Sequence, residues 1–125
     1  MARKPNILFI MTDQQRADHV GFMGNGVVQT PHLDSLAASG CVFENAWVSN
    51  PVCMPNRATI LTGRMPTAHG VIFNDRSLDW HANTFVRQLR ADGYRTALLG
   101  KSHLQHGMSR NAVVDFRGEG AVLPS

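Results

Sequence analysis

The residues with the clearest chemical potential lie in the run Cys53-Met54-Pro55-Asn56-Arg57. Pro51 and Pro55 flank the cysteine, and this predicts an extended approach followed by the start of a helix. Backbone N–H groups at a helix start suit an anionic substrate. Arg57, one turn further on, can offer an oxyanion a forked pair of hydrogen bonds. The run therefore predicts an anion site beside Cys53.

Two ordinary cysteine chemistries can be compared with this spacing. The tyrosine-phosphatase loop requires an arginine six positions after the nucleophile, where this sequence has Thr59. A thiol protease or acyltransferase needs a histidine and an orienting partner brought close in space. The six histidines leave that arrangement open, although no local pattern supports it. An isolated cysteine is otherwise most often a small buried hydrophobic residue.

The motif Cys53-x-Pro55-x-Arg57, followed by Leu61-Thr62-Gly63-Arg64, resembles the signature of the sulfatase family in the alkaline phosphatase-like superfamily. Three further blocks occur in the family's order: Pro5-Asn6-Ile7-Leu8, Gly93-Tyr94-Arg95-Thr96 and Gly100-Lys101-Ser102-His103. Ordered blocks are far more specific than a single short motif. The resemblance runs from Pro5 to His103 and concerns the N-terminal portion of the family only.

The resemblance implies that Cys53 is oxidised to formylglycine by a formylglycine-generating enzyme. In the family the hydrated aldehyde attacks sulfur or phosphorus, and its second hydroxyl then expels the product group without a water attack on an anionic centre. Arg57 would hold the modified side chain and neutralise charge. The implied substrate is a small anionic ester.

Asp13 follows an apolar run that resembles a first core strand, and ligands gather at the carboxyl ends of such strands. Its alternative role is that of a turn or helix-capping aspartate. By resemblance, Asp13 and Gln14 align with the first pair of oxygen ligands of the family's divalent metal. Many sulfatases have a second aspartate where this chain has Gln14. The implied metal is Ca²⁺, with Mg²⁺ or Mn²⁺ as alternatives.

Lys101 and His103 match positions that in sulfatases contact the anionic group and the nucleophile, offering a fixed charge and a proton carrier. Asn74 resembles a substrate-contacting asparagine of the phosphonate-ester branch, although an Asn-Asp pair is usually a turn. His69 and His81 are interpreted as surface or capping residues outside the site. Trp47 and Trp80 are interpreted as core or rim packing residues.

Three functions follow from these residues. The first is a sulfuric-ester hydrolase, favoured by Lys101 and His103. The second is a phosphonate monoester or phosphodiester hydrolase, favoured by Gln14 and Asn74. The third is an inactive, non-enzymatic remnant, because the family's remaining metal ligands come from far downstream and the chain resembles an incomplete fragment.

The elements that must position these residues alternate between strands and helices. This alternation predicts an α/β fold with a mostly parallel sheet flanked by helices, a partial alkaline phosphatase/sulfatase-like fold. The strand from Asn6 to Thr12 is expected to be buried on both faces. The other predicted elements are a helix from Pro31 to Gly40, a strand from Cys41 to Val48, a helix from near Pro55 to Gly63, a helix from Asn83 or Thr84 to Gly93, and a strand from Tyr94 to Leu99.

Residues 1–106 are predicted to form the N-terminal part of a sulfatase catalytic domain, and residues 107–125 a poorly structured C-terminal tail. A sheet with so few strands exposes an edge and an apolar face. We therefore expect self-association through that edge.

Composition excludes several classes of partner. The 125 residues are 43% hydrophobic and 17% charged, with two cysteines and a net charge of +3 from scattered residues. This predicts a globular protein without a disulfide framework and without a nucleic-acid footprint. The apolar run Ile7–Met11 is too short for an export signal or a membrane span. We expect a soluble, cytoplasmic protein that binds no membrane.

Overall fold

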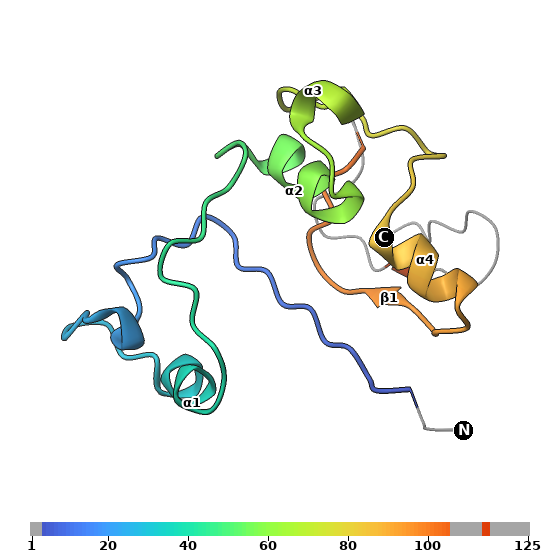
Figure 1. Ribbon diagram of the computed structural model, residues 1–125. Coiled ribbons are helices and arrows are strands. Elements are labelled where there is room, and N and C mark those ends of the chain that lie inside the picture. Colours follow the sequence, from blue (N-terminus) through green and yellow to red (C-terminus); the bar gives the residue numbers. More distant parts are fainter. Residues whose placement is uncertain (1–3, 106–113, 116–125) are drawn as a thin grey trace. The chain divides into compact units, whose positions relative to one another are not determined.

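The computed structural model describes residues 4–105 and 114–115, which fall into two compact units, residues 1–46 and 47–125 (Figure 1). Each unit is described by itself. Unit 1 contains the 3-10 helix η1 (Gly21–Met23) and helix α1 (Pro31–Ser39). Unit 2 contains helices α2 (Cys53–Thr62), α3 (Pro66–His69) and α4 (Phe85–Ala91) and strands β1 (Ala97–Leu98) and β2 (Val114–Asp115).

The strand pairing differs from the predicted parallel sheet. Within the described residues the sheet has two strands, and they are antiparallel, with Ala97 opposite Asp115 and Leu98 opposite Val114. Of the strand predicted from Tyr94 to Leu99, only Ala97 and Leu98 form a strand in the structure. Most of the predicted tail, residues 107–125, lies outside the described part of the chain.

Two of the predicted strands are absent from the described structure. The segment from Asn6 to Thr12 is extended (the blue N-terminal stretch of Figure 1) but belongs to no strand, and most of its side chains are exposed, with Leu8 at 84% and Ile10 at 72%. The segment from Cys41 to Val48 contains a turn and no strand. An apolar run indicates a strand only where neighbouring strands pair with it, and neither segment has that pairing here.

Helix α1 begins at Pro31 as predicted, but its preceding threonine makes different contacts from those of a helix cap. The Thr30 hydroxyl accepts the Gly21 N–H at 2.8 Å and donates to the Asp34 carboxylate at 2.9 Å. A Cβ atom on Gly21 would lie 2.5 Å from an Asp34 oxygen, so a larger residue there would displace the Asp34 carboxylate from these contacts. Helix α1 has no buried residue, and its Leu36 is 63% exposed.

Helix α2 organises unit 2 and begins two residues before the predicted start near Pro55. Val52 is extended, and the helix ends at Gly63, whose left-handed backbone (φ 65°) directs its N–H to the Thr59 carbonyl at 2.8 Å. This is a glycine-terminated helix end. The core of this unit is formed by Met54 and Ala58 of α2 together with Val71 and Leu78.

The remaining helices are short. Helix α4 was predicted, and the Thr84 hydroxyl caps it by accepting the Arg87 N–H at 3.2 Å. Helix α3 was not predicted. Trp47 and Trp80 are 91% and 56% exposed, so neither is a core packing residue. None of the helices in the described ranges is long and apolar enough to cross a membrane.

Candidate active site

Cys53 occupies the first helical position of α2, and its side chain is half-buried. The Nζ atom of Lys101 lies 3.8 Å from its Sγ atom, although the two residues are 48 positions apart in the sequence. Lys101 directly follows Gly100, whose φ of 93° turns the chain after β1. The structure therefore places a fixed positive charge beside the predicted nucleophile.

Arg57 lies one turn along α2 and is 7% exposed, so it is a buried charged residue. Its Nη1 donates to the backbone carbonyl of Lys101 at 2.8 Å. A buried guanidinium is stabilised by such a hydrogen bond. The contact ties the segment that carries Lys101 to the helix that carries Cys53.

Asn74 lies at the same helix start. Its Oδ1 accepts the backbone N–H of Met54 at 3.1 Å, and the N–H of Asp75 lies 3.1 Å from the Met54 sulfur. Met54 is fully buried. Four of the seven predicted site residues, Cys53, Arg57, Asn74 and Lys101, are thus linked directly or through their immediate neighbours.

His103 and Gln14 share an uncommon backbone conformation. Their φ angles are 45° and 50°, in the left-handed region that non-glycine residues seldom adopt. Such residues are concentrated at functional sites. His103 follows Lys101 by two positions, and its Nδ1 atom is shielded from solvent.

Asp13 and Gln14, the predicted metal ligands, are adjacent and exposed in unit 1. Their oxygen atoms fit the chemistry of a hard divalent cation. Ca²⁺ takes about six to eight oxygen ligands, and no group of three or more His, Cys, Asp or Glu residues gathers in the described ranges. The two residues match such an ion in donor type and would supply only part of its shell.

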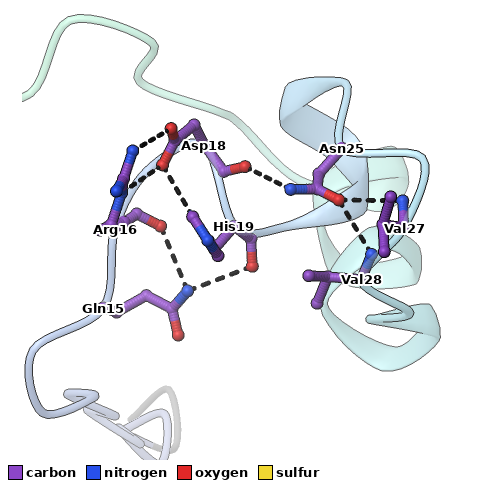
Figure 2. A network of polar contacts seen from close by, with 7 residues as sticks. All are labelled: Gln15, Arg16, Asp18, His19, Asn25, Val27 and Val28. Carbon is purple, nitrogen blue, oxygen red and sulfur yellow. Dashed lines mark hydrogen bonds and ion pairs between the residues drawn. The ribbon is translucent and has the colours of Figure 1, made fainter.

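The loop that follows Gln14 is held by a network of polar side chains (Figure 2). Arg16 forms a forked pair with the Asp18 carboxylate at 2.9 and 2.6 Å, and His19 Nδ1 lies 2.9 Å from the same group. The hydrogen bonds from Arg16 and then from His19 lower the pKa of Asp18, so this carboxylate is charged. Asn25 donates to the Asp18 carbonyl at 2.7 Å and accepts the N–H groups of residues 27 and 28.

Sequence reasoning gave His69 a surface or capping role, and the structure places it, half-buried, in a hydrogen-bonded network. Its Nδ1 accepts the N–H of buried Val71 at 3.1 Å, so a neutral ring carries its proton on Nε2, which lies 2.9 Å from the Thr59 hydroxyl oxygen. Ser49 also donates to that oxygen, at 3.1 Å. Burial, and then the positive charge of Arg64, lower the pKa of His69. The short helix α3, unpredicted from the sequence, is what brings His69 to α2.

The site thus combines a cysteine at a helix start, a lysine beside it and a buried arginine one turn along the helix. The sequence model of the sulfatase family matches residues 5–120, so the chain belongs to the sulfatase family and is by family a sulfatase-type hydrolase. The predicted resemblance is confirmed.

The chain is similar to particular sulfatases. It is 44% identical over 109 residues to an ulvan-active sulfatase of Formosa agariphila, covering 87% of this chain and 21% of that protein. It is 41% identical to an arylsulfatase of Clostridium perfringens, covering 81% of this chain and 21% of that protein. The chain thus spans about a fifth of the length of these curated relatives.

Among solved structures, the chain is similar to the yidJ protein of Bacteroides fragilis, which is assigned to the sulfatases. The TM-score is 0.79 at 34% identity, and the match covers 95% of this chain and 28% of that one. This neighbour supports a part of the alkaline phosphatase-like fold. The mostly parallel sheet is not observed within residues 4–105 and 114–115.

Proposed function

We propose that the protein is a sulfuric-ester hydrolase in which formylglycine, made from Cys53, is the nucleophile. The proposal rests chiefly on Lys101 Nζ, which lies 3.8 Å from Cys53 Sγ at the start of α2. Two sequence blocks far apart in the chain meet there. A cation beside the nucleophile offsets the charge of an approaching sulfate ester.

Conversion of Cys53 replaces its thiol by an aldehyde. The β-carbon loses sulfur as sulfide and gains oxygen, a two-electron oxidation that a formylglycine-generating enzyme must couple to an oxidant. Once formed, the hydrated aldehyde supplies the attacking hydroxyl.

The chain's own residues then have different roles around the substrate. Lys101 binds the anionic group, and Arg57 fixes the backbone of Lys101 through its carbonyl oxygen. His103 carries a proton at its imidazole to or from the reacting oxygen. The amide nitrogen of Asn74 can donate to a substrate oxygen, because the contact to Met54 uses only its Oδ1.

Asp13 and Gln14 are proposed as ligands of a divalent metal, Ca²⁺ in the first place and Mg²⁺ or Mn²⁺ as alternatives. A metal bound there would polarise the substrate oxygen. The carboxylate and the amide oxygen are both ligands for hard cations.

The relatives' names favour sulfate esters, since they are an ulvan-active sulfatase and an arylsulfatase. Gln14 and Asn74 favour a second candidate, a phosphonate monoester or phosphodiester hydrolase. The third candidate is an inactive remnant that keeps the motif. A small anionic ester, a cytoplasmic location, and the absence of nucleic-acid and membrane partners complete the proposal.

One experiment separates these candidates. The chain is co-expressed with a formylglycine-generating enzyme, the Cys53 peptide is examined by mass spectrometry, and an aryl sulfate and a phosphonate monoester are assayed in parallel with Ca²⁺. We expect conversion of Cys53 and faster turnover of the aryl sulfate. Cys53→Ala should abolish turnover, and Cys41→Ala, at an exposed cysteine of unit 1, should not.

An unchanged thiol at Cys53 would reject the formylglycine mechanism. Preferential turnover of the phosphonate would favour the second candidate. Complete conversion with excess metal and no turnover of either ester would favour the remnant.

A further inference from the structure

We propose that Asn74 is a positioning residue for the nucleophile, acting by fixing the first turn of α2 through Met54. This is a different role from the substrate contact implied by family resemblance. Its catalytic meaning rests on the proposed function, but the contact itself can be tested in the unmodified chain.

The start of α2 has no cap from its own flanking residue. The first backbone N–H groups of a helix have no partner within the helix, and a Ser, Thr, Asp or Asn at the N-cap normally satisfies one of them. Here the N-cap is Val52, which has no side-chain acceptor. Pro55 has no N–H, and the Asn56 N–H donates to the Val52 carbonyl at 3.0 Å. This leaves the N–H groups of Cys53 and Met54.

Asn74 supplies the missing acceptor from 20 residues further along the chain, with Oδ1 3.1 Å from the Met54 nitrogen. The contact therefore replaces a local cap by a tertiary one. It connects the turn at residues 73–75 with the residue next to Cys53.

The following residue holds the other end of Met54. The Asp75 N–H lies 3.1 Å from the Met54 sulfur, and Met54 is fully buried with Ala58, Val71 and Leu78. Asp75 has a φ of 69°, in the left-handed region. Backbone and side chain of Met54 are thus fixed from the same turn, and this sets the position of Cys53 relative to Lys101.

The two roles of Asn74 use different atoms and can be separated by substitution. Capping needs the acceptor Oδ1, whereas binding an anionic ester needs the donor Nδ2. Asn74→Asp keeps an acceptor and removes the donor. Asn74→Leu keeps the approximate shape and removes both, and Asn74→Ala removes the side chain.

The first measurement is hydrogen exchange of the Met54 amide by NMR in the whole chain, with thiols reduced. In Asn74→Ala and Asn74→Leu we expect the Met54 amide to exchange roughly fivefold faster or more than in the wild type. This is the size of effect that loss of a helix cap produces. Asn74→Asp should keep the wild-type rate. Asn83→Ala, the same change elsewhere in unit 2, should also keep it.

Three results would overturn the contact: an unchanged Met54 rate in Asn74→Ala and Asn74→Leu, an equally fast rate in Asn74→Asp, or an equal acceleration at Ile60 within α2. If Asn74→Ala does not fold, the exchange rates in Asn74→Leu and Asn74→Asp test the contact between Asn74 and Met54. A chain without hydrolase activity can still give the expected exchange pattern, so failure of the proposed function is recognised separately.

The second measurement tests positioning through a double-mutant cycle. Iodoacetamide alkylation of Cys53 at neutral pH is measured relative to exposed Cys41 in the same chain. Lys101→Met should change the alkylation rate of Cys53 several-fold, since the Lys101 ammonium group lies 3.8 Å from the reacting sulfur. In the Asn74→Leu background that effect should largely vanish. An equal effect of Lys101→Met in both backgrounds would show that Asn74 does not position Cys53.

Discussion

The guanidinium of Arg57 donates to the backbone carbonyl of Lys101 at 2.8 Å, across 44 residues of sequence. The ammonium group of the same lysine lies 3.8 Å from Cys53 Sγ. Arg57 and Cys53 are one turn apart on α2. Arg57 therefore holds the lysine's backbone in place while the lysine's side chain reaches the nucleophile position.

Arg57→Lys should lower the free energy of unfolding by about 1.5–3 kcal/mol, because a hydrogen bond from a charged group to a buried carbonyl is lost or weakened. A lysine cannot reproduce the planar fork of the guanidinium. Urea unfolding measures the effect. Arg76→Lys makes the same change at an exposed position and should leave the midpoint unchanged. Equal midpoints for Arg57→Lys and wild type would contradict a structural role for this contact.

His69 should make stability depend on pH. Its pKa is lowered from 6.5 in the folded chain, by burial and then by Arg64, so the unfolded chain binds more protons than the folded one. The contribution of neutral His69 to the free energy of unfolding is complete above about pH 6.5. It is lost as the pH falls from there toward the pKa of His69 in the folded chain.

We expect the melting temperature to be lower at about pH 5.5 than at about pH 7.5, with a smaller difference in His69→Asn. The asparagine Oδ1 can replace Nδ1 as acceptor for the Val71 N–H without titrating. His81→Asn, at an exposed histidine, serves as the control and should keep the wild-type pH dependence. If His69→Asn keeps it as well, His69 is not the titrating group.

Asp13→Asn should weaken the binding of Ca²⁺ or of the luminescent probe Tb³⁺ by about tenfold or more, because an anionic oxygen ligand becomes neutral. Titration of Tb³⁺ luminescence measures this without any enzymatic assay. Glu44→Gln removes one charge from an exposed position of the same unit and should have little effect. Equal weakening by both substitutions would indicate general electrostatic attraction in place of a ligand.

The exposed apolar segment Ile7–Ile10 should promote association between copies of the chain, because unpaired extended backbone with apolar side chains pairs readily with a second copy. Leu8→Lys should shift the protein toward monomer in light scattering after gel filtration. Leu8 is 84% exposed and Leu99 81%, so Leu99→Lys is the matched control. A wild-type chain that is monomeric at all concentrations would reject self-association.

The sequence alone was sufficient to predict the helices whose local signals are strong. The helix around Arg57 follows from Pro55 and Gly63, and α4 follows from the Thr84 cap and Gly93. The meeting of Cys53 with Lys101 was anticipated only through family resemblance, because no local rule connects residues 48 positions apart.

The sequence-based predictions that differ from the structure have a common physical cause, because they depend on tertiary contacts. The run from Asn6 to Thr12 has the composition of a buried strand, but a strand requires partners that local sequence does not specify. His69 was dismissed because its contacts to Thr59 and Val71 depend on a short helix without a sequence signal. Asn74 was assigned a substrate role, and its contact to Met54 was not foreseen.

The left-handed backbone at Gln14 and His103 lowers the stability of the fold at two positions where the side chain has a proposed chemical role. A side chain at such a φ costs about 1 kcal/mol or more that glycine does not incur. Replacement by glycine should therefore raise thermal stability while removing a proposed ligand or proton carrier. A library of variants selected only for folding should enrich glycine at 14 and 103, whereas selection for ester hydrolysis should retain glutamine and histidine.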